Sequence, residues 1–343
     1  MQDSYEKNME SSSKNSRCKI VFLVWDKEGI RASGISKHIG ASLHFLYTSR
    51  IRHPVLFFKS LQILRKERPT VIICQSPPIT CAFIAMIYQH FFAWASKPKI
   101  LIDVHGIISR PWFENLGKLI MKLVMKHASG ILVINEEWQN YFIENYQVKP
   151  IVLEDPIPDF TGVLSSAKKH EGYEINKKAE FTVAVISSFA VDEPLQVVFD
   201  AGSQLRDVYF YITGDEKKVN KDVLIKKPDN VILTGFLDYI TYVDLLQKVD
   251  VIMDLTTEDK SLVAGAYEAV GLEQPLITSD WSSLRRYFNK GTVYINNSAD
   301  DVIRAIIDVS TRKEDLSNEM HQLKLERTKE WKEKISDIYY LFQ

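Results

Sequence analysis

The stretch that decides the fold covers residues 254–280 and has the sequence DLTTEDKSLVAGAYEAVGLEQPLITSD. An apolar run typical of a strand ends near Asp254, and a polar loop follows it. A helical segment begins at about Leu262 and ends near Gly271, and a second apolar run begins at Pro275. A strand, a loop, a helix and a further strand make one βαβ unit, in which the two strands run parallel.

The same alternation extends along the chain in both directions. Apolar runs of strand length occur at residues 20–25, 70–74, 99–104, 130–134 and 150–153. They recur at residues 181–186, 209–213, 231–234, 249–253, 275–278 and 292–295. Segments with helical spacing lie between them, including 53–66, 79–95, 115–127, 193–204, 239–247 and 299–310. This pattern predicts an α/β protein whose parallel sheets are covered on both faces.

The length of 343 residues favours two domains. Residues 1–16 are polar and rich in Ser and Asn, so we expect a disordered tail there. We predict two Rossmann-like domains over residues 17–155 and 181–312. The linker between them covers residues 156–180, which carry two prolines and several charges. Residues 313–343 are expected to form a C-terminal helix that could cross back to the N-terminal domain.

The composition excludes several classes of protein. Hydrophobic residues make up 45% of the chain and charged residues 25%, which is typical of a globular protein and unlike disordered, collagen-like or coiled-coil chains. The three cysteines have no zinc-ligand spacing and are too few for a disulfide framework, so a reducing compartment is expected. No basic segment followed by an apolar core begins the chain, so we expect no secretory signal and a cytoplasmic location. Residues 79–95 are shorter than the about 20 apolar residues of a membrane span, so we expect a buried or interfacial helix.

The best place for chemistry is the edge of each sheet where the strands end. In open α/β sheets, ligands bind beyond the carboxyl ends of the strands. Two domains that face each other would bring these loops to one cleft. The helix that begins near Ser261 offers free backbone N–H groups, which suit a phosphate. Glu268, inside that helix, could accept both hydroxyls of a ribose, or it could be an ordinary solvated helix glutamate.

Several segments resemble one known family. Residues 267–280 (YEAVGLEQPLITSD), 229–239 (DNVILTGFLDY) and 211–215 (YITGD) resemble the second domain of GT-B glycosyltransferases similar to family 4, and Asp250 fits as well. Residues 71–78 (VIICQSPP) and 101–106 (LIDVHG) look like the acceptor-domain loops of that family. The resemblance implies a GT-B fold, with two Rossmann-like βαβ domains, a cleft between them and a C-terminal helix.

The resemblance also implies a nucleotide-sugar donor bound mainly by the second domain. Glu268 corresponds to the second glutamate of the family's Glu-x7-Glu pattern, the one expected on the ribose. The first glutamate would stand at position 260, where this chain has Lys260. Glu258 or Asp259 could substitute for it, and Lys260 could instead face a phosphate or a sugar carboxylate.

The family's diphosphate-binding cations are also missing. The loop after the first strand of the second domain, residues 187–193 (SSFAVDE), holds no Lys or Arg. Ser187, Ser188 and the helix start near Ser261 would then hold the phosphates by neutral hydrogen bonds. Gly214 fits the family's strand-to-glycine turn and is included in the predicted donor site.

The candidate catalytic residues lie in the first domain. In the relatives, a histidine in the loop of His105 faces the reacting sugar; the alternative is a loop histidine that binds the backbone. Such a histidine could bond a sugar hydroxyl or act as an acid or base, whereas we expect Asp103 to be structural. Asp26 follows the first strand and is a candidate base for an inverting reaction, or an ordinary loop residue. Three further residues of the same loop could meet an acceptor or a diphosphate: Arg31, Ser33 and Gly34.

No metal site is expected, because the sequence has no Asp-x-Asp motif and the GT-B fold can stabilise a leaving diphosphate with helix dipoles and side chains. Asp192 and Glu193 could invite a metal, but adjacent acids are common at helix starts. We therefore predict no cofactor and treat the nucleotide-sugar as a substrate.

The charge is unevenly distributed. Residues 1–150 hold 20 Lys or Arg and 11 Asp or Glu, although the whole chain has a net charge of −1. Lys118, Lys122 and Lys126 share one helix face, and the same domain carries Phe57, Phe58, Phe91, Phe92 and Trp94. This combination favours a peripheral site on the inner face of a membrane, against the alternative of a solvated helix face over a normal core. Nucleic acid fits poorly, because no recognised nucleic-acid-binding module is present.

Together these patterns predict an enzyme that transfers a sugar from a UDP- or GDP-linked donor to a lipid-linked or polysaccharide acceptor. The resemblance implies that no metal is needed and that the anomeric configuration is retained. One alternative is an inactive GT-B subunit that positions a partner enzyme, and another is a nucleotide-sugar 2-epimerase. The lack of a Gly-x-Gly-x-x-Gly after any strand argues against a Rossmann dehydrogenase.

Overall fold

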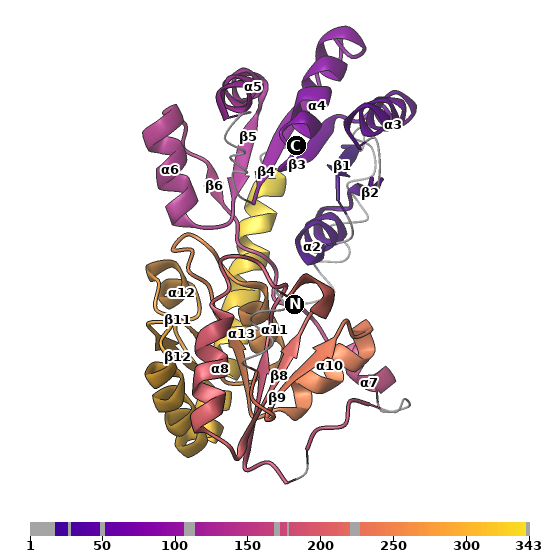
Figure 1. Ribbon diagram of the computed structural model, residues 1–343. Helices are drawn as coiled ribbons and strands as arrows, with labels where there is room; N and C mark the ends of the chain where they lie inside the picture. The colour runs from indigo at the N-terminus through magenta and orange to yellow at the C-terminus, as the bar shows by residue number, and fades with distance from the viewer. Residues whose placement is uncertain are drawn as a thin grey trace. The chain divides into compact units, whose positions relative to one another are not determined.

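The computed structural model describes residues 18–340 except 27–28, 49–51, 106–113, 168–171, 177 and 220–226. The predicted disordered tail over residues 1–16 lies outside this part of the chain. The described chain divides into two compact units (Figure 1). Unit 1 contains the residues up to Glu154 together with those from Lys332 onward, and unit 2 covers Asp155–Trp331.

Unit 1 is built on a parallel sheet of six strands in the order β2-β1-β3-β4-β5-β6. The strands are β1 (Ile20–Val24), β2 (Ser42–Phe45), β3 (Val71–Ser76), β4 (Lys99–Val104), β5 (Gly130–Val133) and β6 (Ile151–Val152). The edge strand β2 was not predicted, since its four residues are exposed or half-buried and make no apolar run. The remaining strands coincide with predicted apolar runs.

The helices of unit 1 cover the sheet because alternate strand residues face opposite ways. Val21 and Leu23 belong to one buried cluster, together with residues of α3 (Arg52–Glu67), α4 (Thr80–Phe91), α5 (Glu114–His127) and α6 (Glu136–Tyr146). Ile20, Phe22 and Val24 are equally buried but point to the other face, which is the face of α2 (Ile30–Ile39).

Unit 2 repeats this architecture with the strand order β12-β11-β10-β7-β8-β9, again all parallel. Its strands are β7 (Phe181–Val185), β8 (Val208–Thr213), β9 (Val231–Gly235), β10 (Val251–Asp254), β11 (Leu276–Ser279) and β12 (Thr292–Ile295). One buried cluster joins the sheet to α8 (Leu195–Gln204) and α13 (Ala299–Tyr340). A second cluster joins the other face to α10 (Tyr239–Lys248), α11 (Ala264–Leu272) and α12 (Ser282–Tyr287).

The stretch predicted as a linker contains regular structure. Helix α7 (Thr161–Ala167) lies within residues 156–180, and Phe160 just before it is buried in the core of unit 2. No periodic pattern marks this segment, because the helix has only seven residues. The two helices predicted over 299–310 and 313–343 are joined in α13, where Arg312 is the residue with non-helical dihedral angles.

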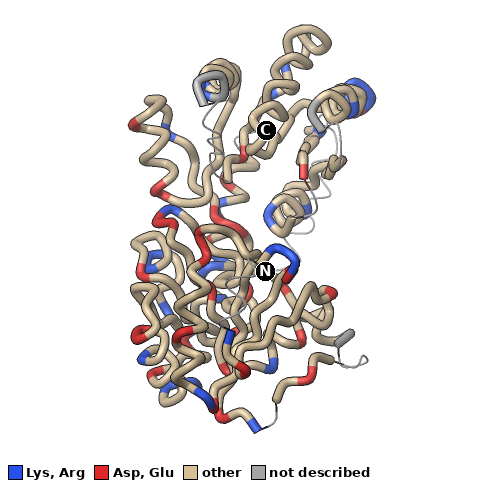
Figure 2. Tube along the Cα trace, in the orientation of Figure 1, with Lys and Arg blue, Asp and Glu red and all other residues tan. Residues whose placement is uncertain are grey.

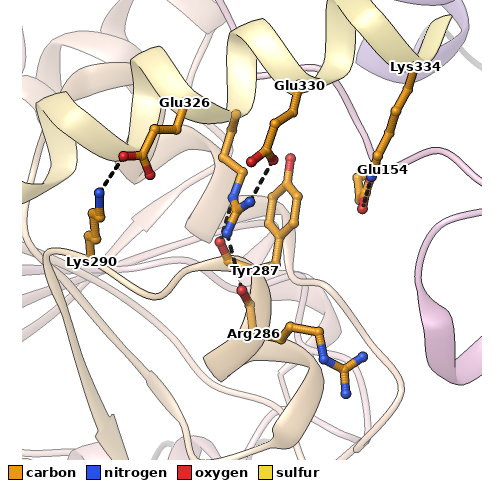
Figure 3. A network of polar contacts seen from close by, with 8 residues as sticks. Glu154, Arg286, Tyr287, Lys290, Glu326, Glu330 and Lys334 are labelled. Carbon is orange, nitrogen blue, oxygen red and sulfur yellow. Dashed lines mark hydrogen bonds and ion pairs between the residues drawn. The ribbon is translucent and has the colours of Figure 1, made fainter.

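Helix α13 is fixed to unit 2 by polar contacts as well as by its apolar face (Figure 3). Arg327 donates from Nε to the Tyr287 carbonyl at 2.9 Å, lies over the Tyr287 ring and pairs with Glu330. Lys290 pairs with Glu326 at 2.5 Å. Beyond Trp331 the helix belongs to unit 1, where Lys334 pairs with Glu154 at 2.7 Å.

Gly291, immediately before β12, tests how closely α13 packs on unit 2. Its φ is +64°, and a Cβ atom there would lie 2.4 Å from the Met320 side chain and 2.6 Å from the Leu316 carbonyl oxygen. Gly235 has a similar φ of +68° but open space around it. We expect Gly291→Ala to lower the free energy of unfolding by about 2 kcal/mol more than Gly235→Ala does, because only the first adds overpacking to backbone strain. Denaturant unfolding measures both, and equal losses would contradict the close packing of α13.

Candidate functional site

The carboxyl edge of the unit 2 sheet has a topological switch point between β7 and β10. These two strands are neighbours, and the chain leaves them in opposite directions, toward β8 and toward β11. In such sheets the crevice at the switch point binds the ligand. The loops that begin here are residues 186–194 and 255–263, which contain most of the predicted donor-site residues.

The loop after β7 is organised around the carboxylate of Glu193. Ser187 Oγ donates to it at 2.5 Å and Ser188 Oγ at 2.8 Å. The backbone N–H groups of Ser188 and Phe189 also donate to it, at 3.0 Å and 2.9 Å. Successive N–H groups that converge in this way form an anion-binding nest. The predicted phosphate donors Ser187 and Ser188 are therefore both hydrogen-bonded to an anion of the chain itself.

The loops after β7, β8 and β10 contact one another. Thr257 N–H donates to the Asp192 carbonyl at 2.8 Å, and Thr256 Oγ1 donates to the Asp192 carboxylate at 3.0 Å. Gly214 follows β8 with a φ of +116°, and a Cβ atom there would lie 2.4 Å from the Ser187 carbonyl oxygen. Position 214 therefore requires glycine for two reasons: its φ is positive, and a side chain would collide with the loop after β7.

Asp254, at the end of β10, holds the first turn of helix α11 against the switch point. The Asp254 carboxylate accepts a hydrogen bond of 2.7 Å from the Gly265 N–H, and a Cβ atom at Gly265 would lie 2.7 Å from that carboxylate. Burial raises the pKa of Asp254 well above its ordinary value; the Gly265 N–H opposes this, and the nearby carboxylates of Glu268, Glu193 and Asp192 add to it. Carboxyl groups thus gather at this edge of the sheet.

Three predicted donor residues lie in the loop before α11. The helix begins at Ala264, with Val263 as its N-cap, two to three residues after the predicted start at Leu262 or Ser261. Glu258 is exposed, whereas Lys260 and Ser261 are half-buried. The sequence did not predict that Asp254 caps this helix, because Asp254 ends β10 whereas its partner Gly265 lies in α11.

Glu268 lies in α11 and is hydrogen-bonded to a tyrosine of α10. Tyr242 Oη donates to Glu268 Oε2 at 2.5 Å. Burial raises the pKa of Glu268 to about 7, and the hydrogen bond from Tyr242 opposes this shift. Burial and the Glu268 charge raise the pKa of Tyr242 well above its usual range, which keeps the phenol protonated as a donor. Glu268 is therefore held by the protein on one side and differs from a solvated helix glutamate.

The unit 1 site is built on a buried ion pair. Arg31 donates to Asp103 from Nε at 2.9 Å and from Nη2 at 2.6 Å, and its Nη1 donates to the Leu153 carbonyl at 2.6 Å. Both side chains are almost fully buried. Burial raises the pKa of Asp103, but the charges and hydrogen bonds of Arg31 and His105 outweigh it and hold that pKa well below its usual range.

This ion pair orients the predicted catalytic histidine. His105 Nε2 lies 2.9 Å from Asp103 Oδ2. Because an ionised carboxylate can only accept, Nε2 carries a proton, and Nδ1 of the neutral ring is then an acceptor. Neutral His105 would therefore accept a hydrogen bond from a sugar hydroxyl, and it could donate from Nδ1 only when charged.

The residues predicted to form an acceptor or diphosphate loop in unit 1 lie in a helix instead. Arg31, Ser33 and Gly34 lie in helix α2, and the Arg31 guanidinium is already bound to Asp103 and Leu153. Asp26 is exposed two residues after the end of β1, at the same edge of the sheet as His105. Gln75 was predicted only as part of an acceptor-domain loop; it lies next to Asp103 in the strand register, and its buried Oε1 has no hydrogen-bond partner among the described residues.

The described residues contain neither a cluster of metal ligands nor a helix that could span a membrane. None of the groups of His, Cys, Asp and Glu side chains in this part of the chain could hold a metal ion with three or more ligands. No described helix is long and apolar enough to cross a membrane.

Solved structures share this fold over nearly the whole chain. The Anabaena protein Alr3699/HepE in complex with UDP-glucose is 14% identical with a TM-score of 0.70, over 94% of this chain and 99% of that one. Sucrose-phosphate synthase from Thermosynechococcus elongatus is 10% identical with a TM-score of 0.71, over 95% and 98% of the two chains. A glycosyltransferase from Rickettsia africae is 14% identical with a TM-score of 0.69, over 96% and 99%. No family model and no curated protein sequence matches. The fold is that of the GT-B glycosyltransferases, as the resemblance predicted.

The buried pair in unit 1 should be sensitive to loss of one partner. We expect Asp103→Ala to lower the free energy of unfolding by about 3–5 kcal/mol, because it leaves the Arg31 charge buried without its carboxylate. Asp280→Ala is the matched control, since Asp280 pairs with Arg285 in the same two-pronged way on the surface and should cost about 1 kcal/mol or less. Denaturant unfolding of both variants measures the difference. Equal costs would mean that Asp103 does not compensate a buried charge.

Proposed function

We propose that this protein is a glycosyltransferase that moves a sugar from a UDP- or GDP-linked donor to a lipid-linked or polysaccharide acceptor. The observation that carries the proposal is the Glu268–Tyr242 pair beside the switch point of unit 2, in a chain with the GT-B fold. One structure with this fold was solved in complex with UDP-glucose. We further propose that the transfer takes place in the cytoplasm without a metal ion and retains the anomeric configuration.

Unit 2 would bind the donor. Glu268 would accept the two hydroxyls of the nucleotide ribose while Tyr242 holds its other side. The diphosphate would lie against the loop of Ser187 and Ser188, near the turn at Gly214. Lys260 would supply the positive charge that this loop lacks, with Glu258 and Ser261 from the same loop facing the donor.

Unit 1 would bind the acceptor and act on the sugar. In the transfer, the bond between the anomeric carbon and the diphosphate oxygen breaks, and an acceptor hydroxyl oxygen bonds to the same carbon. With retention, the hydroxyl proton passes to the leaving diphosphate; with inversion, Asp26 would take it. His105, fixed by Asp103, would hold a sugar hydroxyl through Nδ1. The backbone N–H groups at the unit 2 loops would stabilise the negative charge that develops on the leaving group.

An inactive GT-B subunit that positions a partner enzyme is the second candidate. The observation that favours it is the Glu193 carboxylate, which already bonds the groups proposed to hold phosphate. The presence of Lys260 in place of the family's first glutamate also favours an inactive subunit. The two candidates differ in one measurable property, because only the enzyme must bind a nucleotide-sugar.

The affinity for a nucleotide-sugar should rise with pH because Glu268 must be ionised to accept two ribose hydroxyls. With a pKa of about 7, the carboxyl is mostly protonated at pH 6 and mostly ionised at pH 8, so we expect the dissociation constant to fall by about tenfold between them. Isothermal titration with a panel of UDP- and GDP-sugars measures it. A sugar-linked diphosphate does not itself titrate in this range.

Glu268→Gln is the control for this experiment. It keeps the size of the side chain but removes the titration, so its binding should be about tenfold weaker at pH 8 and independent of pH. Binding that is unchanged by Glu268→Gln would remove Glu268 from the donor site. No binding of any nucleotide-sugar by a folded protein would favour the inactive subunit.

Glu193 should weaken donor binding, because its carboxylate competes with the diphosphate for the same donors. Glu193→Gln removes this charge and keeps a side chain that can still accept hydrogen bonds in the loop. We therefore expect nucleotide-sugar affinity to increase by about threefold to tenfold. Asp192→Asn is the matched control, since the Asp192 carboxylate bonds to Thr256 rather than to the nest, and it should change affinity much less. A loss of affinity in Glu193→Gln alone, with an unchanged melting temperature, would show that the carboxylate supports the donor site.

A further inference from the structure

Unit 1 exposes an unusual set of large apolar side chains on three neighbouring helices. We define the aromatic–basic surface by six of them: Phe58, Phe91, Phe92, Trp94, Leu119 and Leu123. Phe91 is 75% exposed, Trp94 71% and Phe58 69%. In the described residues of unit 2, Phe236 is the one phenylalanine or tryptophan of similar exposure. Large apolar groups that gather on a protein surface mark a site of interaction.

Ring contacts show that the ends of these helices adjoin. The Arg65 guanidinium of α3 lies 5.1 Å from the centre of the Phe92 ring, just after α4. The rings of His90 in α4 and His127 in α5 are 4.5 Å apart. The C-terminal ends of α3, α4 and α5 therefore lie side by side, and the six exposed residues lie on these three neighbouring helices or just after α4.

The charge around this surface is almost entirely positive. Residues 52–68, 80–99 and 118–127 hold ten Lys or Arg side chains and a single acidic one, Glu67. Glu67 is itself bound to His44 at 2.6 Å. Figure 2 shows the basic positions along α3. Lys122 and Lys126 of α5 are exposed beside Leu119 and Leu123.

We propose that the aromatic–basic surface binds a membrane that contains anionic lipid. Aromatic and leucine side chains enter the boundary between headgroups and acyl chains, while Lys and Arg attract the anionic headgroups. A purely apolar protein partner would not account for ten Lys or Arg residues beside a single acidic residue. The inference rests on the proposed function in one respect only: membrane binding would hold the enzyme near a lipid-linked acceptor.

The surface acts as a tether and takes no part in catalysis. Phe91, Phe92 and Trp94 come just before β4, so they lie near its amino end. His105 follows the carboxyl end of the same strand. Changes to the surface should therefore alter membrane binding without altering the affinity for a nucleotide-sugar.

The test is co-flotation of the full chain with vesicles in the absence of any nucleotide. We expect binding to mixed phosphatidylcholine and phosphatidylglycerol vesicles that weakens in high salt, and little binding to phosphatidylcholine alone. Phe91→Ser/Trp94→Ser and Lys122→Glu/Lys126→Glu should each lower partitioning by about tenfold or more. Phe236→Ser and Lys217→Glu/Lys218→Glu, which change exposed residues of unit 2, are the matched controls and should bind as the unaltered protein does.

The possible outcomes are distinct. Melting temperatures confirm that each variant is folded, which is expected because every altered side chain is exposed. An unaltered protein that does not bind anionic vesicles, or surface variants that bind as well as the controls do, would overturn the proposal. A dimer in sedimentation that Phe91→Ser/Trp94→Ser dissociates would assign the surface to a second copy of the chain instead. Nucleotide-sugar binding is measured separately, so failure of the tether and failure of the proposed function cannot be confused.

Discussion

Each described strand of this protein runs parallel to its neighbours, so both sheets are covered by helices and their interiors must be apolar. Polar chemistry is then confined to the edges where the strands end. In both units polar side chains gather at the carboxyl edge: Asp103 lies near the end of β4 and His105 follows it, Asp254 ends β10, and Glu193 lies in the loop after β7. The fold thus selects the position of the site before any residue specifies what the site does.

A charge at such an edge is only partly hydrated, so it must have a partner in the protein or in a ligand. Unit 1 uses a protein partner, because Arg31 binds Asp103 and together they orient His105. In unit 2 the Glu193 carboxylate uses the backbone N–H groups and hydroxyls of its own loop. The first arrangement is buried. The second lies in a half-exposed loop, where a stronger anion can compete for the same donors.

Much of the fold could be read from the sequence because parallel strands covered on both faces are continuous apolar runs. Asn135 followed by two glutamates is typical of a helix start, and its side chain caps α6 by accepting from the Trp138 N–H at 2.9 Å. The half-exposed edge strand β2 and the seven-residue helix α7 carry too little periodicity to be seen. In the site, local motifs located Glu268 and His105, but not their partners Tyr242 and Arg31. Tyr242 is 26 positions from Glu268, and Arg31 is 72 positions from Asp103, the residue through which it orients His105. Only the packing of helices on the sheets brings these residues together.

The two departures from the family pattern are best understood together. The resemblance leads one to expect cations after β7 and a carboxylate at position 260. This chain has a carboxylate after β7, Glu193, and a cation at position 260, Lys260. Both loops begin at the switch point, and they are joined there by the bonds from Thr256 and Thr257 to Asp192. The charges of the two joined loops are thus exchanged. With both substitutions, the numbers of positive and negative groups near the proposed site are closer to those of the family than they would be with only one of them. In the proposed donor site it would also change how a diphosphate is held: Lys260 would supply the positive charge, and the nest would bind phosphate only after Glu193 leaves it. A donor that binds through this exchange would contact the loop before α11 more strongly than the loop after β7.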